Sequence, residues 1–367
     1  MKILIPVATF ERGGGFRVLA ELASRWVDAG HSVDFLVDAR SADPYFPTDA
    51  NIIRFDKNGN TVDQGSAQKG FKKSGNGAEI FIGMFRAVRK SGAEYDVILA
   101  NHSFTALPIA LAGTGAAKKW YYVQAYEPEY YSFTPGWRGR VLQAYSALSY
   151  LLPLRQVANA PIYIGYRGIR ADVWIPPGLD LDLFKRREIE PSFLEGKTIV
   201  IGTIGRHEKT KGTVDVLKAF EILAADNSFI RLRVAFGNLP EGWSHPQAEI
   251  VYPDGDTALA EYYREVDILV AAGTVQHGAC HYPVLEAMAS GTPVITTGYL
   301  PADSSNSWIV PVNNPEAIAN AVRSIAAQTP VALKATLDAA ESAIGPFGWT
   351  SVAADFLNLL TVRNCGK

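Results

Sequence analysis

The chain alternates short apolar runs with segments in which apolar residues recur every three to four positions. Residues 3–8 are almost wholly apolar, which is typical of a strand buried on both faces of a parallel sheet. Apolar residues at helical spacing follow between residues 18 and 27, and residues 32–37 form a second apolar run. This order predicts a βαβ unit at the start of the chain.

The alternation continues, so the chain predicts an α/β protein built on parallel sheets. In the first half the expected elements are a helix over residues 78–89 and strands over residues 97–100, 120–124, 162–164 and 173–175. In the second half they are strands over residues 198–204, 232–236, 249–252, 268–271 and 294–297, and helices over residues 213–225, 258–265, 316–326 and 349–360.

Residues 141–154 come closest to a continuous apolar run, and they lie between Arg140 and Arg155. The run is shorter than the roughly 18 residues that a membrane span requires. It predicts a buried helix. An interfacial membrane helix is the alternative, which the absence of a basic polar face disfavours.

The length of 367 residues exceeds that of a typical single core and predicts two domains. Residues 185–197 are charged and contain a proline, which fits a linker. Residues 58–77 lack periodicity and predict a loop. Its lysines are either solvated or face an anionic acceptor: Lys69, Lys72 and Lys73.

Composition excludes several classes of function. The 35 basic and 37 acidic residues give a formal net charge of −2, which does not indicate general nucleic-acid binding. Cys280 and Cys365 have no metal-type spacing and form no disulfide framework, which fits a reducing cytosol. Residues 1–9 are too short for a secretory signal and lack a cleavage site. We therefore expect a cytoplasmic protein.

A glycine-rich loop follows the first strand. Gly13 and Gly15 fit a dinucleotide-binding fingerprint, but Val18 occupies the position of the third glycine, which disfavours an NAD-dependent oxidoreductase. Gly14 and Gly15 still allow a ligand to approach the backbone closely.

Two strand ends in the first half carry candidate ligand-binding residues. His102 lies just beyond the strand over residues 97–100, where open α/β sheets bind ligands; a structural histidine is the alternative. Residues 125–131 place Glu127 and Glu129 among several tyrosines. This composition suits a carbohydrate, because its ring faces stack on aromatics and its hydroxyls bond to carboxylates. A tyrosine-rich packing loop is the alternative.

A basic glycine turn follows the first strand of the second half. Gly205, Arg206, Lys211 and Gly212 lie at the entrance of a helix. A guanidinium, an ammonium and a helix N-terminus together favour a phosphate. A solvated basic turn is the alternative, and the P-loop motif of NTPases is absent.

Residues 276–297 combine a loop, a short helix and a strand. Pro283 suits the first helical turn, and Gly291 ends the helix. Glu286 lies inside this helix, at an end of the sheet where free backbone N–H groups attract anions and polar oxygens. Considered alone, Glu286 fits a solvated helix carboxylate. Its context in the chain favours a contact with a ligand.

These motifs, in this order, resemble those of the retaining nucleotide-sugar glycosyltransferases with the two-domain GT-B fold, along nearly the whole chain. The segments that carry the resemblance are the glycine loop 13–15, the strand end 96–102, the segment Pro-Gly-Leu-Asp-Leu-Asp-Leu-Phe at 177–184, the basic turn 205–212, the strand Val-Asp-Ile-Leu-Val at 266–270, residues 285–295 and the final helix from Trp349. Residues 122–128 and 281–286 are similar to a subgroup that contains bacterial rhamnosyltransferases of surface-polysaccharide assembly.

The resemblance implies two Rossmann-like parallel-sheet domains facing a cleft. Residues 1–185 would form the acceptor domain, with the helical segment 346–367 crossing back onto it. Residues 186–345 would form the nucleotide-sugar donor domain.

The resemblance also implies roles for the candidate residues. Arg206 and Lys211 would hold the donor diphosphate, Glu286 would bind the ribose hydroxyls, and His102 would lie beside the transferring sugar. Apart from these carried-over roles, Glu127 is a candidate for a base on the acceptor side. The candidate donor-binding residues are Gly14, Gly15, Gly205, Arg206, Lys211, Tyr252, His281, Tyr282, Pro283, Val284 and Glu286.

The chain departs from this family at one position. Members commonly carry two glutamates separated by seven residues, and Gly278 occupies the position of the first, which reaches the donor sugar. Gln276, His277 or His281 would then replace this contact. We expect residues 276–282 to determine the choice of donor.

The expected activity is that of a hexosyltransferase-type enzyme that moves a sugar from a nucleoside diphosphate sugar to an acceptor hydroxyl with retention, in bacterial polysaccharide or O-antigen assembly. Asp180 and Asp182 lie at the domain link, so we expect neither an obligatory metal nor another cofactor. The expected partners are a nucleotide sugar and a glycan or lipid-linked glycan, with peripheral association with the inner membrane or an assembly complex. A catalytically silent sugar-nucleotide-binding protein and a sugar-nucleotide epimerase of similar fold are the alternatives.

Overall fold

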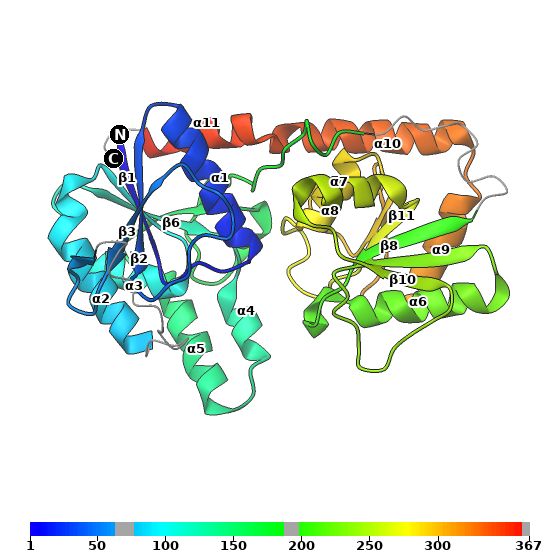
Figure 1. Cartoon of the computed structure of the whole chain (residues 1–367), viewed down its shortest axis with the longest axis horizontal. Coiled ribbons are helices and arrows are strands. Elements are labelled where there is room, and N and C mark those ends of the chain that lie inside the picture. The colour runs from blue at the N-terminus through cyan, green and yellow to red at the C-terminus, as the bar shows by residue number, and fades with distance from the viewer. Residues whose placement is uncertain (63–76, 187–197, 362–367) are drawn as a thin grey trace. The chain divides into compact units, whose positions relative to one another are not determined.

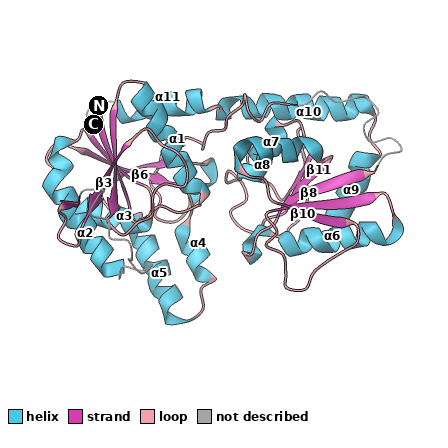
Figure 2. Cartoon of the chain, in the orientation of Figure 1, coloured by secondary structure: helices cyan, strands magenta, loops and turns pink. Residues whose placement is uncertain are grey.

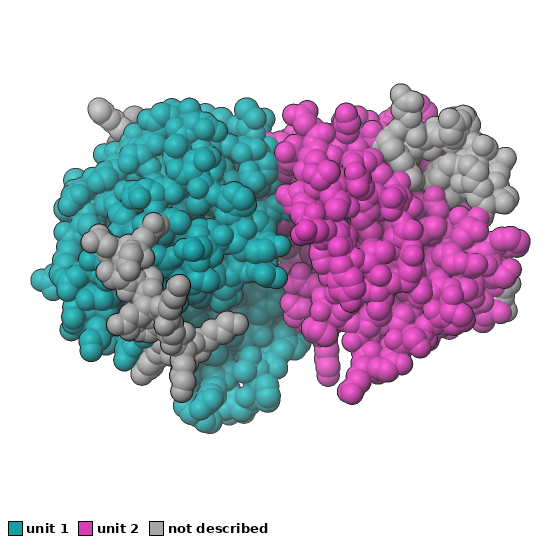
Figure 3. Space-filling view, in the orientation of Figure 1, with its two compact units in different colours: residues 1–178, 349–367 teal, residues 179–348 magenta. Residues whose placement is uncertain are grey.

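The computed structural model describes residues 1–62, 77–186 and 198–361. The chain divides into two compact units: unit 1 is Met1–Gly178 with Trp349–Lys367, and unit 2 is Leu179–Gly348 (Figure 3). Figure 2 shows the strands of each unit gathered at its centre with helices around them. Most of the predicted linker, and the predicted basic loop with Lys69, Lys72 and Lys73, lie outside the described residues.

Unit 1 contains a seven-stranded sheet in the order β4-β3-β2-β1-β5-β6-β7 (Figure 1). Neighbouring strands are parallel except β3 and β4, which are antiparallel. The strands are β1 (Lys2–Val7), β2 (Ser32–Asp38), β3 (Asn51–Phe55), β4 (Thr61–Val62), β5 (Val97–Ala100), β6 (Lys118–Val123) and β7 (Arg155–Ala158). Because β1, β5 and β6 are adjacent and parallel, the loops that follow them meet at one edge of the sheet.

The helices of unit 1 connect these strands as the sequence pattern requires. They are α1 (Gly14–Asp28), α2 (Gly77–Ser91), α3 (Ser103–Leu111), α4 (Glu127–Ser132), α5 (Gly136–Ser149) and α11 (Trp349–Thr361), with the 3-10 helices η2 (Gly92–Glu94) and η3 (Pro161–Gly165). In α1 the apolar stripe predicted from the sequence is buried, with Trp26 wholly inaccessible to solvent.

Helix α11 belongs to unit 1 although it follows unit 2 in the chain. The indole N–H of Trp26 donates to the carbonyl of Ala353 at 3.1 Å. Phe356 is wholly buried, and its ring meets those of Trp26 and Tyr122 at centroid distances of 5.5 and 4.9 Å. The predicted return of the final helix to the first domain is confirmed over the described residues.

Unit 2 contains a six-stranded, fully parallel sheet in the order β10-β9-β8-β11-β12-β13. The strands are β8 (Ile199–Ile204), β9 (Ile230–Ala235), β10 (Ala248–Val251), β11 (Ile268–Ala271), β12 (Val294–Thr296) and β13 (Trp308–Ile309). The helices are α6 (Thr213–Asp226), α7 (Gly255–Glu265), α8 (Tyr282–Ala289), α9 (Pro315–Ala326) and α10 (Pro330–Ile344), with the 3-10 helices η4 (Lys209–Lys211) and η5 (Gly345–Phe347).

The boundary between the units lies at Gly178 rather than at residue 185. The backbone N–H of Leu179 donates to the carbonyl of Phe347 at 2.7 Å. Phe184 is wholly buried beside Tyr263, at a ring centroid distance of 6.2 Å. Residues 179–184 therefore pack as part of unit 2.

Two predicted elements of unit 1 are wrong. Residues 162–164 lie in the 3-10 helix η3, because Pro161 opens a helical turn. The strand that pairs with β6 is β7 instead, and residue Trp174 joins it only through an isolated bridge to Ala158. The helix predicted as buried over residues 141–154 corresponds to α5, on which Trp137, Val141 and Leu148 are exposed. None of the described helices is long and apolar enough to cross a membrane.

Candidate active site

In unit 1 the loops that follow β1, β5 and β6 line a cavity of about 440 Å³. This edge of a parallel sheet is where α/β folds bind ligands. The residues of the cavity that bear on its chemistry are Gly15, His102, Gln124, Glu127, Tyr130 and Tyr131. The structure therefore brings together three of the predicted site residues of the first half, Gly15, His102 and Glu127.

His102 is the N-cap residue of α3. Its Nδ1 accepts from the backbone N–H of Phe104 at 3.2 Å, and its Nε2 lies 3.3 Å from Oε2 of Glu127. Because Nδ1 accepts, Nε2 carries the proton that points to the carboxylate. The side chain is 41% exposed, so the imidazole is oriented on one side and open to the cavity on the other.

Glu127 is buried and held by several donors. Its Oε1 accepts from the backbone N–H of Ser103 at 2.9 Å and from the hydroxyl of Tyr121 at 3.3 Å, and its Oε2 accepts from the hydroxyl of Ser103. The carboxylate also lies at the N-terminus of α3, where the helix dipole favours a negative charge. These contacts favour a role in positioning His102 over the predicted role of acceptor-side base.

The negative charge at Glu127 affects the tyrosines around it. The pKa of Tyr131 is raised to about 12, first by burial and then by Glu127, and the pKa of Tyr145 is raised to about 12 by the same two causes. Tyr126 stacks on Tyr150 at 5.7 Å and meets Tyr166 edge-on at 4.6 Å. The predicted alternative of a tyrosine-rich packing loop is thus correct for Tyr126, while Tyr130 and Tyr131 line the cavity.

The glycine loop brings the N-terminus of α1 to the same cavity. Gly14 is the first residue of α1, and its N-cap Gly13 supplies no side-chain cap. A Cβ on Gly15 would lie 3.1 Å from Oε1 of Gln124, so a side chain there would press on the cavity wall. Gly14 itself does not line the cavity.

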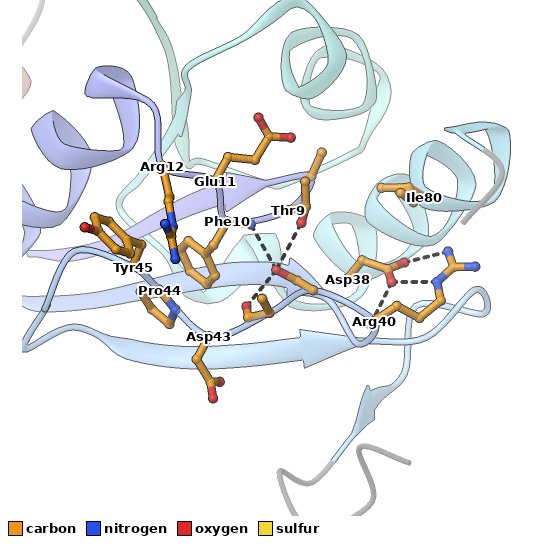
Figure 4. Close-up of a pocket in the computed structure, with 13 residues that line it drawn as sticks. Thr9, Phe10, Glu11, Arg12, Asp38, Arg40, Asp43, Pro44, Tyr45 and Ile80 are labelled. Atoms are coloured by element: carbon orange, nitrogen blue, oxygen red, sulfur yellow. Dashed lines mark hydrogen bonds and ion pairs between the residues drawn. The ribbon is translucent and has the colours of Figure 1, made fainter. Parts of the chain in front are cut away.

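A larger cavity of about 900 Å³ lies beside the first one, between the loops after β1 and β2 (Figure 4). Its walls are fixed by polar contacts: Arg40 forms a two-pronged ion pair with Asp38, and the backbone N–H of Phe10 donates to the hydroxyl of Ser41 at 2.9 Å. Arg12 lies over the ring of Tyr45 at 4.6 Å. The sequence pattern does not predict this cavity, because neither β3 nor the segment before it carries a motif.

In unit 2 the predicted basic turn has a backbone that only glycine permits at two positions. A Cβ on Gly205 would overlap the carbonyl oxygen of Gly237, and a Cβ on Gly212 would overlap that of Ala272. Gly212 also has φ of +73°. Thr213 closes the turn: its hydroxyl accepts from the N–H of Arg206 at 3.0 Å and bonds to the Arg206 carbonyl at 3.1 Å.

Arg206 lies close enough to Lys211 and His281 for its charge to affect the pKa of both. Burial and the charge of Arg206 lower the pKa of Lys211. Burial lowers the pKa of His281 well below its usual value, and Lys211 and Arg206 contribute to this. His281 is therefore neutral at pH 7, and its Nδ1 is buried with no hydrogen-bond partner in the described parts of the chain.

Glu208, which the sequence did not single out, neutralises Arg206. Nη2 and Nε of Arg206 lie 2.9 and 3.2 Å from its carboxylate oxygens, and this lowers the pKa of Glu208 to about 2. Both side chains are about half exposed. A ligand phosphate would therefore meet an Arg206 that is already paired with Glu208, and a partly buried Lys211 nearby.

Helix α8 confirms the predicted loop and helix, with His281 as N-cap and Pro283 in the first turn. Glu286 is buried, and its Oε2 accepts from the hydroxyl of Tyr263 at 2.8 Å. The alternative of a solvated helix carboxylate is therefore wrong. Val284 is wholly buried, so only its backbone can meet a donor, whereas Tyr282 remains partly exposed.

Gly278 has φ of +88°, a conformation that favours glycine. Its N–H donates to the carbonyl of Gly298 at 2.7 Å. The backbone here would be strained with a glutamate, so the conformation of this loop suits the glycine that the chain has at this position. Gln276 is buried with φ of +52°.

The sequence motifs do not predict the ring contacts around this loop. Tyr299 lies 4.8 Å from the ring of His281 and 5.7 Å from that of His277. His277 Nε2 lies 3.2 Å from the carbonyl of Gly273. Tyr263 and Tyr299 sit in segments with no motif, and only the fold brings them to α8.

Tyr252 follows β10 and is 71% exposed. A Cβ on Gly237 would lie 2.9 Å from its hydroxyl, and the carbonyl of Gly237 packs against Gly205. Tyr252 is thus a neighbour of the basic turn, with its ring free to stack on a flat ligand group.

Residues 198–328 match the family model described as Glycosyl transferases group 1, which covers unit 2 from β8 to the end of α9. No curated protein matches the sequence of the chain.

Several solved structures resemble the chain along nearly its whole length. Sucrose-phosphate synthase from Thermosynechococcus elongatus has a TM-score of 0.74 at 18% identity, covering 98% of this chain and 98% of that one. HepE from Anabaena, in complex with UDP and glucose, has a TM-score of 0.68 at 17% identity and covers 99% and 100%. WaaG, a glycosyltransferase involved in lipopolysaccharide biosynthesis, has a TM-score of 0.68 at 16% identity and covers 98% and 100%. The predicted GT-B fold is confirmed.

Proposed function

We propose that this protein is a glycosyltransferase that moves a sugar from a nucleoside diphosphate sugar to an acceptor hydroxyl. The observation that carries the proposal is the convergence of Arg206 and Lys211 on His281 at the N-terminus of α8. Two cations and a helix N-terminus form a site for a diphosphate. The match of this same segment to a glycosyltransferase family model supports it.

In the proposed reaction the bond between the anomeric carbon and the β-phosphate oxygen breaks, and a bond from the acceptor oxygen to that carbon forms. The acceptor proton passes to the leaving phosphate. Lys211, Arg206 and the N-terminus of α8 stabilise the charge that develops on this phosphate. The proposed reaction therefore does not require a metal ion for this stabilisation. The reaction retains the anomeric configuration.

The remaining candidate residues complete the donor site of unit 2 in this proposal. Glu286, oriented by Tyr263, accepts from the ribose hydroxyls. Tyr252 stacks on the base, because its exposed ring neighbours the basic turn. The loop 276–282 contacts the sugar and determines which donor is used.

In unit 1 the cavity that contains His102 is proposed to receive the acceptor hydroxyl. Tyr130 and Tyr131 offer ring faces, and His102 offers a fixed imidazole. The acceptor class proposed is a glycan or lipid-linked glycan of bacterial polysaccharide assembly, with rhamnosyl transfer as one candidate reaction. HepE was solved with UDP and glucose, which makes UDP-hexoses the first donors to test.

The test is a donor panel followed by a transfer assay. A true donor at about a hundred times its Kd should raise Tm by about 5 °C or more, because it binds only the folded protein. UDP-glucose, dTDP-rhamnose and UDP alone are compared. The stabilising donor is then mixed with glycan acceptors, and release of nucleoside diphosphate should depend on the acceptor. Donor binding without any transfer indicates a silent binding protein, and donor conversion without acceptor indicates an epimerase.

Donor affinity should fall at alkaline pH through Lys211. Because burial lowers the pKa of Lys211, the free protein loses this proton at a lower pH than an exposed lysine would. The diphosphate binds the protonated form, so UDP affinity should be constant near pH 7 and decline as pH rises through that pKa. Calorimetric titration of UDP from pH 7 to about 10 measures this. Lys211→Arg, which stays charged, should remove the decline; an identical decline in both proteins would contradict the assignment.

A further inference from the structure

Helix α5 extends from the sheet of unit 1 (Figure 1) and carries an exposed apolar stripe. It consists of Phe133, Trp137, Val141, Leu148 and Leu151, which are 59%, 71%, 55%, 62% and 58% exposed. At 100° per residue, the three side chains on the helix itself point within about 60° of one another. An apolar patch of this kind marks an interaction surface rather than ordinary surface exposure.

The other side of α5 is packed against unit 1 through small residues. Gly139, Ser146 and Ser149 are buried, and a Cβ on Gly139 would overlap the carbonyl oxygen of Thr134. The hydroxyl of Ser149 lies 3.4 Å from that of Tyr121 inside the unit. Because this side has room only for small side chains, the helix cannot turn its large apolar residues inward. The apolar side chains of the stripe therefore stay on the outer surface of unit 1.

Arginines flank the stripe at both ends. Arg138 and Arg140 are exposed and project to either side of Trp137. At the other end the exposed Arg170 donates through Nη2 to the carbonyl of Leu152 at 2.6 Å. Residues 130–171 contain five arginines and no aspartate, glutamate or lysine. Every charged side chain in this segment is therefore basic.

We propose that the α5 stripe and its arginines bind the surface of an anionic lipid bilayer. Aromatic and aliphatic side chains with flanking cations are the composition that binds at a membrane interface, where rings and methyl groups enter the headgroup region and guanidinium groups pair with lipid phosphates. This binding is independent of the proposed transfer reaction. The interfacial membrane helix was disfavoured above because the segment lacks a basic polar face. In the structure the arginines flank the apolar side of the helix instead.

A second copy of the chain is the less suitable occupant. Both ends of the stripe carry arginine, so parallel and antiparallel pairing of two copies would each bring arginine next to arginine. No acidic residue between positions 130 and 171 is present to offset this repulsion. Phospholipids with anionic headgroups supply the missing negative charge.

The experiment is sedimentation of the full chain with vesicles of phosphatidylcholine alone or mixed with phosphatidylglycerol. Binding should require phosphatidylglycerol and weaken with salt. The variant Trp137→Ser with Leu148→Ser and the variant Arg138→Glu with Arg140→Glu should each lower the apparent affinity by about tenfold or more. Circular dichroism and Tm show that both variants fold.

Matched controls change equally exposed residues elsewhere. Phe229→Ser with Val331→Ser removes apolar side chains that are 62% and 80% exposed. Arg89→Glu with Lys218→Glu reverses two exposed charges. Both controls should bind vesicles as the unmodified protein does.

Four outcomes would overturn the proposal: no binding to either vesicle, equal binding to neutral and anionic vesicles, an equal loss of binding in the controls, or concentration-dependent dimers that only the stripe variants abolish. The last outcome would assign the stripe to an interface between copies of the chain. Selective loss of binding to anionic vesicles in the two stripe variants supports the proposal.

Discussion

Replacing Lys211 by alanine is expected to lower turnover with a nucleotide sugar by about a hundredfold or more, while leaving the fold intact. The ammonium is partly buried beside Arg206, so its charge acts on the developing phosphate charge where water screens it less than at an open surface. Removal of one such preorganised group typically costs about 10²–10³ in rate. Arg206→Ala should cost less, although still more than tenfold, because Arg206 is about half exposed and already shares its charge with Glu208.

Initial rates at saturating donor, together with Tm, measure this effect. Lys209→Ala is the matched control, since Lys209 is an exposed lysine on the same 3-10 turn. It should retain near-normal turnover. Near-normal transfer by both Lys211→Ala and Arg206→Ala would rule out the phosphate site, and with it the central step of the proposed function.

The parts of the fold that the sequence predicted well are those governed by local pattern. The strand at residues 97–100 is confirmed as β5 because four consecutive apolar residues suit only a strand buried on both faces. Helix α8 is confirmed because a proline at its start and Gly291 at its end bound the apolar stripe. The basic turn is confirmed because Gly205 and Gly212 occupy positions that a Cβ would block.

The errors lie where contacts distant in sequence decide the structure. The apolar run 141–154 predicts a buried helix, yet α5 packs on unit 1 through its small residues, with the hydroxyl of Ser149 3.4 Å from that of Tyr121. This packing leaves Val141 and Leu148 outside. Residues 155–158 became β7 because β6 offers a parallel edge to pair with. Helix α10 was not predicted, although Thr329 caps it through its side chain.

The candidate site shows the same division. The sequence identified His102, Arg206, Lys211 and Glu286, each of which follows a strand or enters a helix. It did not identify the residues that orient them, among them Ser103, Tyr121, Glu208, Tyr263 and Tyr299, because these come from other segments and carry no motif. Glu127 was identified with a different role, since its donors become visible only in the folded chain.

The contacts of Glu127 determine what a conservative change would do. An amide at this position must keep oxygen at Oε1, because the backbone N–H of Ser103 can only donate. The amide nitrogen then occupies Oε2, where the hydroxyl of Ser103 can reverse and accept. Nε2 of His102 cannot accept from the amide, because it carries the ring proton while Nδ1 accepts from the backbone. Glu127→Gln would therefore leave His102 without its acceptor.

Glu127→Gln is accordingly expected to lower turnover by about ten- to a hundredfold, the order of effect of losing one charge-assisted hydrogen bond of about 1.5–3 kcal/mol. If Glu127 positions His102, the effects of Glu127→Gln and His102→Ala should be strongly non-additive, and the pH profile of turnover should keep its shape. If Glu127 were the base, its variant would lose the acidic limb of the profile while His102→Ala kept it. Glu11→Gln, on the wall of the same cavity, serves as the control for loss of a nearby charge. Additive effects of the two variants would contradict the positioning role. If Glu127 acts only through its hydrogen bond to His102, His102→Ala already removes that bond, and Glu127→Gln should then have no further effect.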